Sequence, residues 1–345
     1  MKAMLLQRTW NLEENPEPLQ AVKVPVPQPS PGEMLVRVTA CGVCHTELDE
    51  IEGRTPPPRF PMILGHQVVG IVEETNSESP IFANGERVGI GWIYSACGKC
   101  DYCRSGNENL CPDFRATGRD YYGGYAEYMT VPQAFAYRIP EIFSDSEAAP
   151  LLCAGAIGYR SLRLSGMRDG QTLGLTGFGA SAHIVLKLAK YLFPHSEFFV
   201  FSRSESEQVF ARELGAAWAG NITDSPPVNL DCMIDTTPVW KPVVESLRHL
   251  APGGRLVINA IRKEDLDKHH LLELDYPLHL WMEKEIKSVA NVSRQDVREF
   301  LQLAASIPIR PEFQEYPLIH ANQALLELKN RKIKGAKVLR LDRNP

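Results

Sequence analysis

The sequence has no excess of positive charge and contains neither a long apolar run nor an apolar leader. Its 345 residues include 37 Lys and Arg against 42 Asp and Glu, giving a formal net charge of −5 and a pI of about 6.0. This balance argues against a nucleic-acid or anionic-membrane partner. No apolar run approaches the length of a membrane span, about 18 residues. The chain turns acidic by Glu13 without a long apolar segment, so we expect no secretory signal and a cytoplasmic location.

The length and composition predict two domains of a globular protein. Hydrophobic residues make up 44% of the chain and charged residues 23%, and 345 residues exceed the size of one ordinary core. The first 150 residues are rich in Pro and Gly and contain short β-type runs at 34–39 and 68–74. We predict a barrel-like β-domain there, with no long helix before about residue 145.

After about residue 153 the pattern changes to alternating strands and helices, which indicates an α/β domain with a Rossmann-type doubly wound parallel sheet. The chain then returns to the first domain, so the predicted domains are 1–152 with 290–345, and 153–289. The predicted strands of the alternating part are 171–176, 198–201, 232–235 and 255–258, and its predicted helices are 180–192, 205–214 and 239–250. The returning segment is predicted to hold a helix at 296–305 and a strand at 338–341.

A glycine-rich turn joins the first strand and helix of the alternating part. In this G-x-G-x-x-A pattern Gly177 makes the tight turn, Gly179 lets the backbone approach a pyrophosphate, and Ala182 permits close packing of helix on sheet. Ala180 and Ser181 open the helix, whose unpaired N–H groups favour an anion. The hexapeptide alone is weak evidence, but its place between strand and helix predicts a dinucleotide site.

The end of the next strand indicates which dinucleotide is bound. An NAD enzyme normally carries an acidic residue there, on the ribose 2′-hydroxyl. This chain has Ser202 followed by Arg203, and a hydroxyl and a guanidinium suit a 2′-phosphate, so we favour NADP(H). The nearby Glu205 and Glu207 weaken this preference, and the alternative is that Arg203 is a solvated loop residue.

Four cysteines lie within 15 residues in the first domain. Zinc binds four thiolates in a closed tetrahedral site, and a reducing compartment favours metal over disulfides at this spacing. A disulfide-rich loop is the alternative, but two-residue gaps suit the pairing of neighbours poorly. We predict one structural zinc, bound by Cys97, Cys100, Cys103 and Cys111.

The three residues with the chemistry of a catalytic zinc site are far apart in the sequence. A zinc ion bound by Cys44, His66 and Cys153 would keep one open coordination position. Their spacing in the sequence, however, does not indicate that the three residues lie close together. Each one alone is as well explained by an ordinary buried cysteine or a histidine after a strand. A second site therefore needs evidence beyond spacing.

The order of motifs along the chain supplies that evidence. CGVCHTEL (41–48), GHQVVG (65–70), the four-cysteine segment, GGYAEYMTVP (123–132), LLCAGAIGYRSL (151–162) and the glycine-rich turn follow one another. Together they closely resemble the zinc-dependent alcohol dehydrogenases of the medium-chain dehydrogenase/reductase family, over nearly the whole chain. The resemblance implies a GroES-like catalytic domain interrupted by a Rossmann domain, with a small-molecule alcohol or aldehyde as substrate.

The resemblance also implies roles for single residues. It implies that a catalytic zinc is bound by Cys44, His66 and Cys153. With the structural zinc, this gives two zinc ions per chain. Thr46 matches the hydroxyl that takes the alcohol proton, with hydrogen bonding to the backbone as the alternative. Glu47 matches the acidic residue that supports the zinc-bound histidine, and His45 matches a basic residue near the pyrophosphate. We also considered Lys334 and Lys337 as phosphate contacts, although lysines near a terminus are usually solvated.

This chain departs from the family pattern at three positions. Gln67 stands where a glutamate usually lies behind the zinc, which makes the site less negative. Asp49 replaces the histidine that often ends the proton relay, and a carboxylate with an ordinary pKa of about 3.9 is a weaker base at neutral pH. Ile157 replaces a hydroxyl found near the nicotinamide in some relatives. These departures affect substrate and rate, and they leave every metal ligand in place.

The sequence leaves alternatives to an alcohol dehydrogenase open. One alternative is a polyol or sugar-alcohol dehydrogenase of the same fold, in which a Glu often replaces the second cysteine ligand of the catalytic metal. The presence of Cys153 at that position argues against this alternative. A non-catalytic dinucleotide-binding protein, such as a redox sensor, is the other alternative, against which the retained ligands speak. The relatives are dimers or tetramers, so we expect a homo-oligomer of one of these kinds.

Overall fold

The computed structural model describes residues 1–330 and 335–341 and divides into two compact units. The first unit contains Met1–Cys153 and Val292–Pro345, and the second contains Ala154–Asn291. The boundaries expected from the sequence, 152 and 290, lie one and two residues from these limits.

The first unit is built on β-sheets around the long strand β3 (Glu33–Val43). Among the described residues, its largest sheet has the order β10-β6-β5-β3-β18-β17, with β9 also pairing with β3. β3 and β5 (Val68–Thr75) contain the β-type runs expected from the sequence. The other strands are β1 (Lys2–Leu6), β2 (Leu19–Lys23), β4 (Met62–Ile63), β6 (Arg87–Ile90), β7 (Ile93–Ser95), β8 (Arg115–Ala116), β9 (Tyr128–Pro132), β10 (Ala136–Arg138), β17 (Phe313–Pro317) and β18 (Ala336–Arg340).

The returning segment completes the first unit. β18 pairs antiparallel with β3, where Leu339 lies opposite Cys41, and both side chains are buried. Burial of such apolar side chains stabilises the sheet by about 25 cal/mol per Å². A parallel strand, β17, and a helix after it were not predicted. The helices of this unit are α1 (His45–Ile51), α2 (Asp101–Arg104), α3 (Asp145–Pro150), α8 (Arg294–Ser306) and α9 (Ala321–Lys329).

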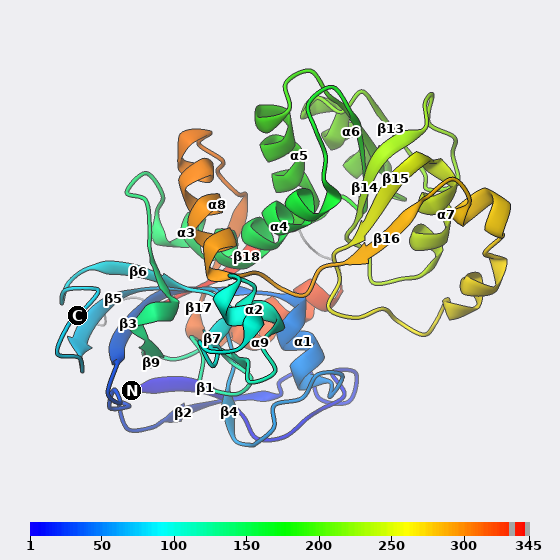
Figure 1. Cartoon of the computed structure of the whole chain (residues 1–345). Helices are drawn as coiled ribbons and strands as arrows, with labels where there is room; N and C mark the ends of the chain where they lie inside the picture. Colours follow the sequence, from blue (N-terminus) through cyan, green and yellow to red (C-terminus); the bar gives the residue numbers. More distant parts are fainter. Residues whose placement is uncertain (331–334, 342–345) are drawn as a thin grey trace. The chain divides into compact units, whose positions relative to one another are not determined.

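The second unit confirms the predicted Rossmann-type sheet. In the part of the chain that the structure describes, it contains parallel strands in the order β13-β12-β11-β14-β15-β16, with α4 and α5 on one side and α7 on the other (Figure 1). The order reverses beside β11, which is where open α/β sheets bind ligands. The strands are β11 (Thr172–Thr176), β12 (Glu197–Phe201), β13 (Trp218–Gly220), β14 (Leu230–Asp235), β15 (Leu250–Ile258) and β16 (Glu285–Ser288), and the helices are α4 (Ala156–Ser165), α5 (Ala180–Leu192), α6 (Glu205–Glu213) and α7 (Lys241–His249).

The apolar periodicity of the sequence explains these elements. The strands of the parallel sheet read as short apolar runs because both faces are covered, and Leu173, Val200 and Ile234 are fully buried. α5 buries Ile184, Val185 and Leu188 at helical spacing, as predicted. No helix within residues 1–330 and 335–341 is long and apolar enough to cross a membrane.

Candidate active site

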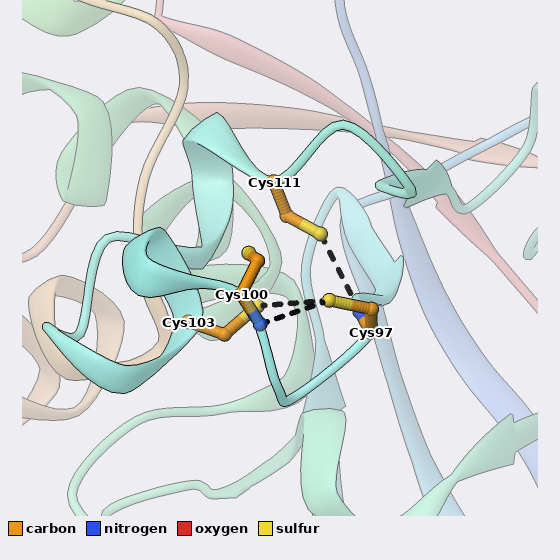
Figure 2. Close-up of side chains that lie close together, drawn as sticks. All are labelled: Cys97, Cys100, Cys103 and Cys111. Atoms are coloured by element: carbon orange, nitrogen blue, oxygen red, sulfur yellow. Dashed lines mark hydrogen bonds between the residues drawn. The ribbon is translucent and has the colours of Figure 1, made fainter.

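The four-cysteine segment brings its sulfur atoms together. The Sγ atoms of Cys97, Cys100, Cys103 and Cys111 all lie within 4.8 Å of one another. Cys97 begins the segment after β7, Cys100 caps α2, Cys103 lies within α2, and Cys111 follows a 3₁₀ turn, so the local folding aims all four side chains inward (Figure 2). Among the described residues the cysteines form no disulfide.

Backbone amides support charged sulfur in this segment. The amide of Cys97 donates to Cys111 Sγ and the amide of Cys100 donates to Cys97 Sγ, each at 3.4 Å (Figure 2). Hydrogen bonds from the backbone of Lys99 and Cys100 lower the pKa of Cys97 to about 6. Thiolates are the form that binds zinc, so the donor set fits a closed tetrahedral ion.

A second cluster joins residues that spacing could not join. One ligand atom each of Cys44, His66 and Cys153 lies within 4.8 Å of the others, and His66 Nε2 is 3.4 Å from Cys153 Sγ. Cys44 follows β3 and caps α1. His66 precedes β5, and Cys153 lies in the π-helical turn Leu151–Gly155. Two thiols and one imidazole are a suitable ligand set for a zinc ion that keeps one coordination position open.

The two thiols of this cluster interact with each other. A hydrogen bond from Cys153 holds the pKa of Cys44 well below its usual value, and the same bond and burial raise the pKa of Cys153. His66 Nδ1 is 2.6 Å from Glu47 Oε1, and both side chains are buried. This contact leaves Nε2 of His66 facing the two sulfurs, which is the arrangement in which a carboxylate orients a ligating histidine.

The residues expected around this cluster lie as follows. Glu47 also accepts a hydrogen bond from the Cys44 amide at 2.7 Å and so closes the first turn of α1. Thr46 is half-buried, with Oγ1 3.7 Å from Cys44 Sγ. His45 is exposed at the first position of α1.

The two polar departures from the family pattern are both buried. Gln67 packs its side chain against Gly42, where an added Cβ would lie 2.3 Å from Gln67 Oε1. Asp49 Oδ1 lies 2.5 Å from Arg54 Nε. This carboxylate oxygen is therefore already engaged by a guanidinium.

Sequence reasoning missed Glu50, which lies near this cluster. Its side chain is fully buried, and neither carboxylate oxygen has a hydrogen-bond partner among the described residues. Burial, and then the charge of Glu47, raise the pKa of Glu50 well above its usual value. The available signal was its spacing, because residues three apart share a helix face and Glu47 points inward.

The second unit contains the glycine-rich turn where the sequence predicts it. Gly177 has a φ of +75°, and an added Cβ would lie 2.9 Å from Thr236 Oγ1. Gly179 caps α5, and an added Cβ would meet nothing within 4 Å. The turn is therefore tight at its first glycine and open at its second, which fits a pyrophosphate at the N-terminus of α5.

The small residues that open α5 serve packing in this structure. Ser181 Oγ donates to the carbonyl of Ala154 at 3.0 Å, and Ala182 is fully buried. Gly158 of α4 lies close to α5, because an added Cβ would be 2.6 Å from Val185. The backbone of Ala180 begins the helix, and its side chain lies outside the described part.

The end of β12 places a carboxylate beside the expected ribose position. Ser202 is buried, and its hydroxyl donates to Glu207 Oε2 and accepts from the Ser204 amide at 3.1 Å. Arg203 is exposed beside it. Of the lysines considered for phosphate contacts, Lys334 lies outside the described residues. Lys337 is buried, with Nζ 2.7 Å from Glu327 and 2.6 Å from Tyr316 Oη, so its ammonium group is already engaged.

The chain is similar in sequence to known alcohol dehydrogenases. The family described as alcohol dehydrogenase GroES-like domain matches residues 30–141. A probable alcohol dehydrogenase, AdhA, of Mycobacterium tuberculosis (strain CDC 1551 / Oshkosh) is 46% identical over 327 residues, which cover 93% of this chain and 92% of that protein. An alcohol dehydrogenase of Geobacillus stearothermophilus is 34% identical over 332 residues, covering 94% and 96%.

A solved structure shows the same fold. The cobalt- and zinc-bound thermostable alcohol dehydrogenase from Pyrobaculum aerophilum superposes with a TM-score of 0.84 at 24% identity, covering 99% of each chain. The sequence relatives span nearly the full length, and both candidate metal clusters and the glycine-rich turn are present in this chain. The chain therefore belongs to the zinc-binding alcohol dehydrogenases of the medium-chain dehydrogenase/reductase family.

Proposed function

We propose that this protein reversibly oxidises a primary or secondary alcohol to the aldehyde or ketone, with zinc and a nicotinamide dinucleotide. The observation that carries this proposal is the meeting of Cys44, His66 and Cys153. Two sulfurs and one imidazole leave a position for the substrate oxygen, as catalytic zinc sites do. The four-cysteine segment would hold a second zinc, which orders the loop and takes no part in chemistry.

Each protein residue has a defined task in this proposal. When bound, zinc polarises the substrate oxygen and the nicotinamide exchanges a hydride with the carbinol carbon. Cys44 and Cys153 supply negative charge that moderates the ion. Glu47 contacts Nδ1 of His66 and so orients the ring with Nε2 toward the zinc position. Gln67, unlike a glutamate, adds no negative charge behind the zinc position.

Thr46 is the proposed first acceptor of the alcohol proton. Its hydroxyl is half-buried beside Cys44 and can pass a proton while it receives one. Beyond it, Asp49 is paired with Arg54, so its Oδ1 atom already has a partner. We propose that Asp49 positions the outer part of the relay and that solvent receives the proton.

For the cofactor we propose NADP(H) over NAD(H). Arg203 at the end of β12 provides a positive charge for a 2′-phosphate, and Ser202 provides a small hydroxyl. Glu207 opposes this choice, since its carboxylate contacts Ser202. We therefore propose that Glu207 must leave Ser202 when NADP(H) binds. This requirement limits the preference for NADP(H) over NAD(H). We place His45, which is exposed at the start of α1, near the pyrophosphate.

The test combines metal content with turnover. We expect about two zinc ions per chain and consumption of NADPH or NADH, followed at 340 nm, with short and aromatic aldehydes. Cys44→Ser should abolish turnover and lose about one zinc, and Cys41→Ser is the matched control because Cys41 is a buried cysteine outside both clusters. Zinc and dinucleotide binding without turnover of any alcohol or carbonyl would favour the non-catalytic alternative, and turnover restricted to polyols would favour the polyol dehydrogenase.

We also propose that the protein is a homodimer or homotetramer in the cytoplasm. β16 is an edge strand whose residues are all exposed, and exposed apolar side chains lie in and before it: Leu272, Tyr276, Trp281, Met282 and Ile286. An unpaired edge beside exposed apolar groups is suited to a second copy. Sedimentation analysis should give a dimer or tetramer that Ile286→Lys weakens, and a wild-type monomer at micromolar concentration would contradict this. The clustered thiols suit a reducing compartment.

A further inference from the structure

The second unit contains a buried ion pair for which the proposed chemistry has no use. Lys263, in the loop after β15, contacts Asp235, the last residue of β14, and their side chains are 6% and 0% exposed. Lys263 Nζ also donates to the carbonyls of Thr237 at 2.6 Å and Val239 at 3.1 Å. Its three protons therefore all have acceptors, and the charge is satisfied within the protein.

The same carboxylate reaches a third segment. Asp235 Oδ1 accepts from Thr176 Oγ1 at 2.5 Å and from Thr237 Oγ1 at 2.7 Å. Thr176 is the last residue of β11, directly before the glycine-rich turn. One ion pair thus joins the carboxyl ends of β11 and β14 to the loop after β15.

This junction lies at the point of the sheet where a dinucleotide is expected. β11 and β14 are neighbours, and Thr176 lies opposite Asp235 in the register. The amide and the hydroxyl of Thr236 both donate to the carbonyl of Thr176, at 3.0 and 2.9 Å, and Thr236 also lies against Gly177. Movement of the segment after β14 would therefore move the first glycine of the turn.

The strand order shows which half of the cofactor is concerned. Ser202, at the end of β12, marks the adenosine ribose, and the turn after β11 holds the pyrophosphate. β14 lies on the other side of β11 from β12, so the nicotinamide half lies toward Asp235. A buried ion pair stabilises a fold no better than apolar side chains of similar size, so its charge is better explained by the geometry it fixes.

We propose that Asp235 and Lys263 are positioning residues of the dinucleotide site, which hold the segment Thr236–Val239 and Gly177 in the arrangement that receives the nicotinamide half. This rests on the proposed function only in taking a nicotinamide dinucleotide as the cofactor.

The experiment measures nucleotide binding to the zinc-loaded protein by fluorescence, with NADPH, NADH and adenosine monophosphate, and records amide hydrogen exchange of 236–239. Lys263→Met should raise the dissociation constant of both dinucleotides by about tenfold or more, with faster exchange in that segment. Binding of adenosine monophosphate should stay within about twofold, because that ligand lacks the nicotinamide half. Asp235→Asn keeps the size of the side chain and should show the same pattern if Lys263→Met folds poorly.

Arg255→Gln is the matched control. It removes another ion pair of the same sheet, Arg255 with Glu285 at 2.8 Å, which lies away from the carboxyl ends of the strands. It should leave all three dissociation constants unchanged. Equal dinucleotide affinity in wild type and both variants would overturn the inference, and so would a parallel loss of adenosine monophosphate binding. A wild-type protein that binds neither dinucleotide would instead overturn the proposed function together with the inference.

Discussion

Glu108 accepts two hydrogen bonds from Arg294, a residue 186 positions away in the chain. Glu108 Oε1 is 2.9 Å from the Arg294 backbone amide and 2.8 Å from its Nε, and Glu108 is buried. Glu108 belongs to the four-cysteine segment, and Arg294 is the first residue of α8. The four-cysteine segment is thereby tied to the returning part of the chain.

This relationship predicts a loss of stability on removal of the charge. Glu108→Gln should lower the free energy of unfolding by about 2 kcal/mol, since hydrogen bonds to a buried charge contribute about 1.5–3 kcal/mol. Denaturant unfolding of the zinc-loaded protein measures the change. Asp101→Asn is the control within the same segment, because its ion pair with Arg104 is exposed and should contribute little. Equal effects of the two substitutions would contradict this account.

The same pair predicts how stability depends on pH. Burial raises the pKa of Glu108, but the hydrogen bonds from Arg294 outweigh it and hold the pKa below its usual value. A carboxyl whose pKa is lowered on folding stabilises the protein above its unfolded pKa, about 4.3, and this contribution is lost as the pH falls through the folded pKa. The stability difference between wild type and Glu108→Gln should be constant near neutral pH and shrink below about pH 4. A difference that grows on acidification would refute it.

The two glycines of the cofactor turn should respond differently to alanine. Gly177→Ala places a Cβ at a φ of +75° and 2.9 Å from Thr236 Oγ1, and should cost about 1–3 kcal/mol of stability as well as dinucleotide affinity. Gly179→Ala meets no protein atom within 4 Å, so it should fold normally and lose affinity only by obstructing the pyrophosphate. Thermal unfolding and fluorescence titration separate the two effects. Wild-type affinity in Gly179→Ala would mean that the pyrophosphate lies elsewhere.

Glu207 should limit the preference for NADP(H). Its carboxylate contacts Ser202, where it would repel a 2′-phosphate. Glu207→Gln should raise the ratio of kcat/KM for NADPH to that for NADH by about tenfold, the size of a typical coupling to one nearby charge. Arg203→Gln should change the same ratio in the opposite direction. Glu205→Gln is the control, because Glu205 is exposed at the start of α6.

Loss of one structural ligand should separate the two metal sites. Cys111→Ser should remove about one zinc per chain and lower the unfolding temperature, because metal binding orders that segment. The zinc proposed at Cys44, His66 and Cys153 should remain. Metal analysis and calorimetry check this together. Loss of both ions at once would show that the two sites are not independent.

The sequence alone determined the parts of this protein that depend on local patterns. Short apolar runs that alternate with amphipathic helical segments predicted the parallel sheet. A strand whose two faces are both covered needs apolar side chains along its whole length. The close spacing of Cys97, Cys100, Cys103 and Cys111 predicted their cluster, because a loop of that length can turn around one ion. The glycine-rich turn was predicted from its G-x-G-x-x-A pattern between a strand and a helix. The structure gives Gly177 a φ of +75°, which Gly adopts readily.

The tertiary structure decided what depends on distant segments. Cys44, His66 and Cys153 come from three separate parts of the chain, and spacing carries no information about distances between them; the family resemblance supplied the grouping, and the fold brings the atoms together. The burial of Glu50, the pairing of Asp49 with Arg54 and the contact of Glu207 with Ser202 were equally out of reach. The sequence gives the charge of a side chain. The partner of that charge and the exposure of the side chain to water depend on residues that only folding brings near.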